Sequence, residues 1–147
     1  MFNSIVVGTD GSATATVAVR EAVDVAKATG ATLELVSAFT PVREAQLREE
    51  RREAPEDVAW AIHPRHEVEA SLTDAADIAR EAGVDANTYA REGDPADAIL
   101  DVAEERGADL IIIGNKGMTG AKRFLLGSVP NKVSQHASCS VLIVRTT

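Results

Sequence analysis

Short runs of apolar, mostly β-branched residues recur along the chain, and alanine-rich stretches of helical length separate most of them. The runs lie at residues 4–8, 32–38, 87–90, 109–114 and 140–144. This alternation of strand-like and helix-like segments predicts parallel β-α units. Several of the runs are nearly continuous in apolar residues, as expected for strands that helices cover on both faces. The pattern therefore predicts an α/β fold with a single doubly wound, five-stranded parallel sheet and helices on both faces.

Residues that favour helix ends indicate where the helices begin and end. The helices are expected at about 13–29, 66–82 and 95–106, with a last one beginning near Pro130. Ser12 is expected to cap the first helix and Gly30 to end it. Pro95 suits the first turn of the third helix, and Gly83 and Gly107 follow the second and third helices.

Residues 39–65 depart from this alternation. Ten of the fifteen residues from 43 to 57 are charged, and both signs are mixed. Mixed charge at helical spacing is typical of a solvated surface, so we interpret this segment as a solvated helical or mobile excursion. A flap that binds a partner is the alternative.

The length of 147 residues fits one domain spanning 1–147. No segment reaches the roughly 18–20 uninterrupted apolar residues that a membrane span needs, and the N-terminus lacks the features of a secretion signal. The single cysteine, Cys139, is consistent with a reducing compartment and is expected to be a half-buried structural thiol. We therefore expect a cytoplasmic protein with no membrane partner.

The net charge of −8 is distributed unevenly. All 23 acidic side chains lie in residues 1–109, whereas residues 110–147 contain five basic side chains and no acidic one. An acidic chain is a poor binder of nucleic acid, which usually requires a broad basic face, so no nucleic-acid partner is expected. A compact anion remains compatible with the basic C-terminal quarter. The alternative is that the two parts of the chain balance each other electrostatically.

Glycines gather in the same basic region, between the fourth and fifth apolar runs. Gly114 and Gly117 lack Cβ atoms, so peptide N–H groups there can approach a phosphate closely. Gly127 and Ser128 precede the last predicted helix, whose N-terminus would favour an anion. The chain has neither a Walker loop nor the dinucleotide fingerprint after its first strand. Ordinary turn and capping roles for these residues are the alternative.

The spacing G-x2-G-x9-G-[ST] resembles the nucleotide-binding signature of the universal stress protein family. The opening "IVVGTDGS", the stretch "ADLIIIGNKG", the segment "LLGSV" and the closing "VLIV" are also similar to that family and occur in the same order. The resemblance implies the strand order 3-2-1-4-5, binding of an adenine nucleotide and a homodimer that forms through the last strand, residues 140–144.

The resemblance also implies which residues meet the nucleotide. These are Thr9, Asp10, Ala38, Ile113, Gly114, Gly117, Gly127, Ser128 and Val129. Asp10 is expected near the ribose, the phosphate or a Mg²⁺ ion that accompanies ATP, and Ala38 beside the adenine. Pro130 departs from the family pattern because it lacks the N–H and hydroxyl of a threonine. This leaves ATP and cyclic AMP as alternative ligands.

The function that we expect is nucleotide-dependent sensing or signalling in a stress response. A slow ATPase or phosphotransferase is a second hypothesis, although no motif beyond Asp10 offers a general base. An interaction module with an empty loop is a third. The pairs His63/His66 and His136/Cys139 each lack a third ligand at a suitable spacing, so no protein-bound metal centre is expected.

Overall fold

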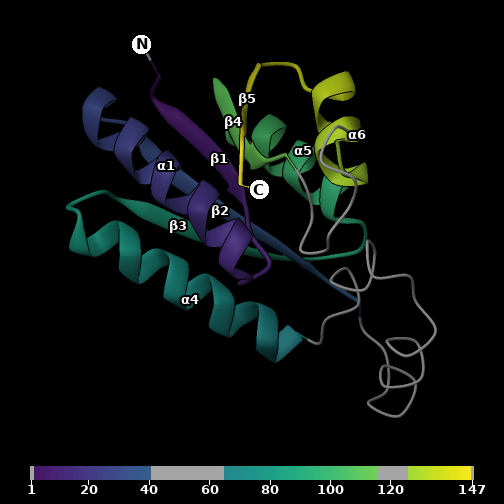
Figure 1. Cartoon of the computed structure of the whole chain (residues 1–147), viewed down its shortest axis with the longest axis horizontal. Coiled ribbons are helices and arrows are strands. Elements are labelled where there is room, and N and C mark those ends of the chain that lie inside the picture. Colours follow the sequence, from purple (N-terminus) through teal and green to yellow (C-terminus); the bar gives the residue numbers. More distant parts are fainter. Residues whose placement is uncertain (1, 41–64, 116–125, 147) are drawn as a thin grey trace.

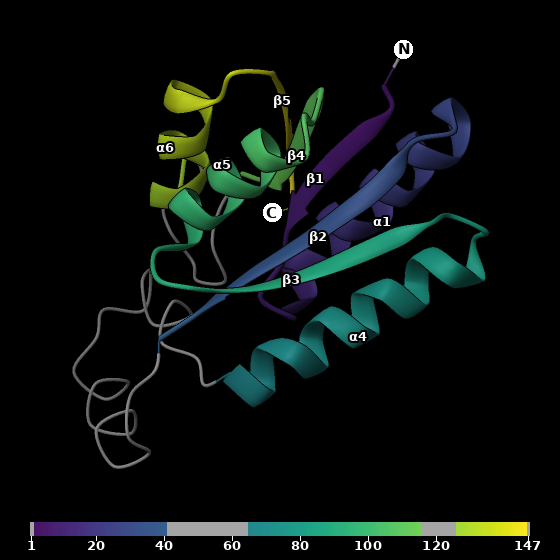
Figure 2. The ribbon, with the colours of Figure 1, turned by 180° about the vertical axis from the view of Figure 1, so that it is seen from behind.

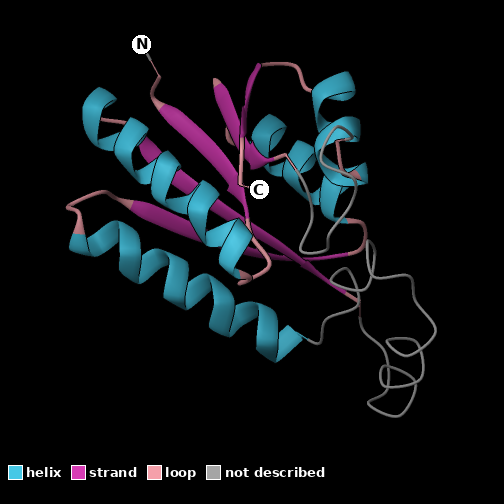
Figure 3. Cartoon of the chain, in the orientation of Figure 1, coloured by secondary structure: helices cyan, strands magenta, loops and turns pink. Residues whose placement is uncertain are grey.

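A computed structural model describes residues 2–40, 65–115 and 126–146 (Figure 1). The strands are β1 (Ser4–Gly8), β2 (Thr32–Phe39), β3 (Ala86–Glu92), β4 (Leu110–Gly114) and β5 (Ser140–Val144). The helices are α1 (Ala13–Thr29), α4 (Arg65–Glu81), α5 (Pro95–Glu105) and α6 (Ser128–His136). Strands and helices thus alternate along the described chain, as the apolar pattern predicts (Figure 3).

The five strands form one parallel sheet in the order β3-β2-β1-β4-β5. Strand β1 lies in the centre, where Ile5 pairs with Leu33 of β2 on one side and with Leu110 of β4 on the other. The chain therefore winds outward from β1 in both directions, and the order reverses between β1 and β4. The predicted α/β fold and the implied strand order are both confirmed.

Helices cover the two faces of the sheet in pairs (Figures 1 and 2). On one face, α1 and α4 pack against Ile5, Leu33 and Leu35. On the other face, α5 and α6 pack against Val6 and Val36, together with further residues of β4. Neighbouring residues of a strand point to opposite faces, so each central strand contributes to both cores.

The predicted helix boundaries agree closely with the structure. Ser12 accepts a hydrogen bond from the N–H of Ala15 and caps α1, and Gly30 ends α1 in the left-handed region at φ 77°. Asp94 caps α5, with Pro95 in its first turn. The last helix begins at Ser128, two residues before the predicted Pro130, because Gly127 already has the extended conformation of an N-cap. In the described ranges, no helix is long and apolar enough to cross a membrane.

The excursion predicted for residues 39–65 lies almost entirely outside the described residues. Phe39 closes β2 and Arg65 opens α4. The guanidinium carbon of Arg65 lies 5.5 Å from the centre of the Phe39 ring, a cation–π contact between the two ends of this segment.

Cys139 lies directly before β5 and is half-buried, as predicted for a structural thiol. Burial raises the pKa of this thiol, and the negative charge of Asp109 adds to the effect. Little thiolate therefore forms at neutral pH, and the thiol has the low reactivity of a structural cysteine.

Candidate functional site

A pocket opens at the carboxyl end of the sheet, where the strand order reverses between β1 and β4. It contains about 520 Å³ of space, part of it open to solvent. Its lining residues come from six elements and the turn after β1: Gly8, Thr9, Asp10, Ser12, Thr14, Ala15, Val36, Ser37, Ala38, Pro95, Ile99, Ile113, Gly114, Val129 and Pro130. Such a switch point is the usual ligand site of a doubly wound sheet.

The turn between β1 and α1 is held by its own hydrogen bonds. The N–H of Thr9 donates to the carbonyl of Val36 at 2.9 Å, which continues the pairing of β1 with β2. Oγ1 of Thr9 accepts from the N–H of Gly11, and Oδ1 of Asp10 accepts from the N–H of Ser12. In the described part of the chain, Oδ2 of Asp10 makes no hydrogen bond, so this oxygen is available to a ligand.

Other side chains closely approach two glycines of this turn. A Cβ atom on Gly8 would lie 2.5 Å from Cδ1 of Ile99, so glycine lets α5 pack closely beneath the pocket. Gly11 has φ +82°, which side chains rarely adopt, and a Cβ there would collide with Oγ of Ser71 on α4. The sequence shows both glycines as part of the stretch "IVVGTDGS" but does not reveal these two contacts.

The N-termini of the helices at the pocket differ in charge. The first turn of α5 carries Asp97 behind the capping carboxylate of Asp94, and Lys132 of α6 pairs with both at 2.9 and 3.4 Å. The hydrogen bond to Asp97 raises the pKa of Lys132. The first turn of α6 contains no acidic residue. The partial positive charge at the α6 N-terminus is therefore not offset by an acid of its own first turn, and it favours an anion there.

The start of α6 is not capped by Ser128, the serine considered for this role from the sequence. Gly127 is the N-cap residue, and no side chain makes the capping hydrogen bond. The N–H of Gly127 donates instead to the carbonyl of Asn115 at 3.1 Å. Ser128 is exposed as the first helical residue, whereas Val129 and Pro130 are buried. The interpretation of Ser128 as a helix cap is therefore wrong, because the glycine before it occupies that position.

The structure brings together most of the nucleotide-binding residues implied by the family resemblance. Six of them line the pocket: Thr9, Asp10, Ala38, Ile113, Gly114 and Val129. Gly127 and Ser128 are described but are not among the lining residues. Gly117 lies outside the described residues, as do the basic residues Lys116, Lys122 and Arg123.

Several pocket residues were not anticipated from the sequence. Pro95 and Ile99 come from α5, and Thr14 and Ala15 from the first turn of α1. Pro95 opens a helix that follows a predicted strand, and such helix starts lie at the carboxyl edge of a parallel sheet. This order in the sequence could have indicated Pro95 as a pocket residue. Within the described residues, no group of three or more His, Cys, Asp or Glu side chains is placed to hold a metal ion.

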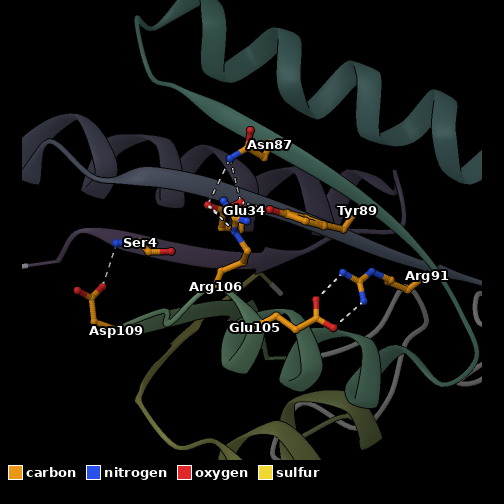
Figure 4. Close-up of polar contacts among 8 residues, drawn as sticks. All are labelled: Ser4, Glu34, Asn87, Tyr89, Arg91, Glu105, Arg106 and Asp109. Carbon is orange, nitrogen blue, oxygen red and sulfur yellow. Dashed lines mark hydrogen bonds and ion pairs between the residues drawn. The ribbon is translucent and has the colours of Figure 1, made fainter.

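A second polar group lies on the α5 side of the sheet, on β2 and β3 (Figure 4). The carboxylate of Glu34 is buried, with only 3% of the residue exposed. It accepts hydrogen bonds from the hydroxyl of Tyr89 at 2.7 Å and from Nδ2 of Asn87 at 3.2 Å, and Nε of Arg106 lies 4.0 Å away. Burial and the hydrogen bond to Glu34 raise the pKa of Tyr89 to about 12. No motif in the sequence indicates this group, because Glu34 and its partners are far apart in the chain.

Comparison with known proteins identifies the family. The sequence model of the universal stress protein family matches residues 1–145. The chain therefore belongs to the universal stress protein family, as the sequence resemblance implies.

Individual relatives match over nearly the whole chain. Universal stress protein YxiE of Bacillus subtilis is 39% identical over 99% of this chain and 100% of its own length. Universal stress protein Rv1636 of Mycobacterium tuberculosis is 37% identical over 99% of this chain and 98% of its own. The crystal structure of a universal stress protein in complex with cAMP is 32% identical, with a TM-score of 0.74 and 99% of each chain covered.

Proposed function

We propose that this universal stress protein is a single domain that binds an adenine nucleotide in the pocket. Its main role is sensing or signalling rather than catalysis of a reaction. The observation that carries the proposal is the pocket at the switch point, which combines apolar walls with a helix N-terminus whose first turn lacks acidic residues. The relative in complex with cAMP, 32% identical, supports the same class of ligand.

The chemistry of the pocket favours one orientation of the nucleotide. Val36 and Ala38 offer an apolar wall to the adenine, and the carboxylate of Asp10 suits the ribose hydroxyls or a metal bound to the nucleotide. Like charges repel, so the phosphate is expected away from Asp10, toward Gly114 and the start of α6. We propose that Thr9, Ile113, Gly117, Gly127, Ser128 and Val129 complete the site.

The number of backbone donors bears on the choice between ATP and cyclic AMP. The first residues of a helix have N–H groups without intrahelical partners. At α6, the N–H of Gly127 already bonds Asn115 and Pro130 has none, so Ser128 and Val129 supply the available donors among the described residues. Two donors suit one phosphate group. ATP would need further charge neutralisation, which Mg²⁺ held by Asp10 can provide.

A slow ATPase or phosphotransferase remains the second candidate, and Asp10 is the observation that favours it. If sensing is the main function, hydrolysis should be far below the ordinary enzyme range of about 1–10³ per second. A metal-dependent turnover near one per second that is lost in Asp10→Asn would establish the enzymatic alternative instead.

Calorimetric titration with ATP and cyclic AMP tests the proposed site. Hydrogen bonds to charged groups contribute about 1.5–3 kcal/mol, so Ser128→Ala should weaken binding roughly 10- to 100-fold if its hydroxyl contacts phosphate. The melting temperature should hardly change, because Ser128 does not cap α6. Ser134→Ala is the matched control, since this exposed serine lies at the other end of the same helix.

Unchanged affinity in Ser128→Ala would remove Ser128 from the site. The wild type could also bind neither nucleotide, with mass spectrometry detecting no nucleotide released on denaturation. That result would favour the interaction module with an empty loop.

The assembly that we propose is a homodimer that forms through β5 and acts in the cytoplasm. Strand β5 is at the edge of the sheet, and Leu142 on it is 40% exposed. Exposed apolar edge strands favour pairing with a second copy. Light scattering that gave the mass of a monomer at high micromolar concentration would contradict the dimer, and cell fractionation tests the location.

A further inference from the structure

Asn115 joins three parts of the chain at the carboxyl end of the sheet. Its N–H donates to the carbonyl of Val144 at 2.8 Å, which extends the pairing of β4 with β5 by one residue. Its own carbonyl accepts from the N–H of Gly127 at 3.1 Å, at the N-cap of α6. Its side-chain Oδ1 accepts from the N–H of Thr146 at 2.8 Å and from the Thr146 hydroxyl at 3.1 Å.

These contacts lie next to the proposed phosphate end of the pocket. Gly114, directly before Asn115, lines the pocket at the end of β4, and Val129, two residues after Gly127, lines it from α6. The bond between Asn115 and Gly127 therefore fixes the distance between the β4 wall and the α6 wall. Gly114 restrains the backbone little, so the orientation of the Asn115 peptide depends on its other attachments.

The side chain of Asn115 provides the second of those attachments. Without its bonds to Thr146, the backbone bond to Val144 would be the only described bond between this residue and the C-terminal segment, and its carbonyl could turn away from Gly127. Two anchors, one at the end of β5 and one just after it, restrict that rotation more than one anchor does. The residues that follow β5 thus help to place the N-terminus of α6.

We propose that Asn115 is a positioning residue for the phosphate group of the nucleotide and acts through the anchor formed with Thr146. The inference rests on the proposed function. It predicts that a change at Thr146, near the end of the chain and not among the pocket-lining residues, alters phosphate affinity. The adenosine part of the ligand meets other residues, so adenosine affinity should not change.

A graded series of variants tests the anchor. Asn115→Ala and Thr146→Pro each remove both bonds, because proline lacks the backbone N–H, and each should weaken the binding of AMP and cyclic AMP about 3- to 10-fold. Thr146→Ala keeps the backbone N–H and should lose less than about 3-fold. The double variant Asn115→Ala/Thr146→Pro should bind no more weakly than either single variant, because all three lack the same contact.

Adenosine titration distinguishes positioning from general loss of structure. Its affinity should stay within about twofold of wild type in every variant, and Gln135→Ala on the exposed face of α6 should bind all three ligands normally. Equal losses for adenosine and AMP, additive losses in the double variant, or normal AMP binding by Asn115→Ala would each overturn the inference. If the wild type binds none of these ligands, the proposed function fails first and the inference fails with it.

Discussion

The two faces of the sheet differ in how completely helices cover them. On one face, α1 and α4 are 17 residues long each, and the core contains 18 of the described residues in buried positions. On the other, α5 and α6 have 11 and 9 residues, and the described part of the core contains 12. The pocket and the buried carboxylate of Glu34 are associated with the second face. We infer that the long helices supply most of the stability, whereas the short helices leave room for a ligand.

Two neighbouring residues of β2 show the same difference at the level of single side chains. Leu35 points into the core beneath α1 and α4 and has no exposed surface. Glu34 points to the other face and meets hydrogen-bond donors from β3. Variants of this pair test whether the two faces contribute as differently as their packing indicates.

The largest effect is expected for Leu35→Ala. Truncating a fully buried leucine removes apolar contacts and leaves a cavity, which costs about 2–5 kcal/mol of the free energy of unfolding. Urea denaturation measures this loss, and Val17→Ala on the exposed side of α1, where Val17 is 40% exposed, is the control and should change stability little. A loss below about 1 kcal/mol would show that this face does not dominate stability.

A smaller loss is expected for Glu34→Ala. The variant removes a hydrogen-bonded carboxylate, and bonds to charged groups contribute about 1.5–3 kcal/mol. Glu34→Gln keeps the side-chain size and an acceptor for Tyr89, so it should lose less. If Glu34→Ala were as stable as wild type, the desolvation penalty of the buried carboxylate would fully offset the stabilisation by its hydrogen bonds.

Gly8→Ala tests the close packing of α5 beneath the pocket. The added Cβ would lie 2.5 Å from Cδ1 of Ile99, and overpacking of this kind typically costs about 1–3 kcal/mol. Ile99→Val removes that Cδ1 atom, so the double variant should recover part of the loss. Thermal melts compare the three variants with wild type, and an equal or greater loss in the double variant would rule out this contact as the cause.

The smallest effect is expected for Tyr89→Phe, which removes one hydrogen bond to the Glu34 carboxylate and leaves the bond from Asn87 in place. The loss should lie at the lower end of the range for bonds to charged groups, about 1.5 kcal/mol. The pKa of Tyr89 is raised from 10.0 to about 12 in the folded protein, so the folded state holds this proton more tightly. Its stabilising contribution is complete below pH 10 and is lost as the pH rises toward 12. Denaturation across this range should show a shallower decline in the phenylalanine variant, and identical pH profiles would contradict the assignment.

The agreement between sequence and structure is closest where local patterns decide the outcome. The predicted strand at 4–8 matches β1, and the prediction for 32–38 ends one residue before β2 does. β3 is longer than predicted, Ala86–Glu92 instead of 87–90, because its polar residues interrupt the apolar pattern. Asn87 and Tyr89 belong to the strand because they pair with β2 and contact Glu34.

The sequence by itself determined the elements of this protein, the ends of its helices and the family to which it belongs. These features depend on residues close together in the chain, such as Ser12 before α1 and Gly30 after it. Tertiary structure alone decided that Gly127 caps α6 while its N–H bonds Asn115, and that Glu34 meets Tyr89 across 55 positions of sequence. Such contacts depend on which strands become neighbours, and local preferences do not carry that information.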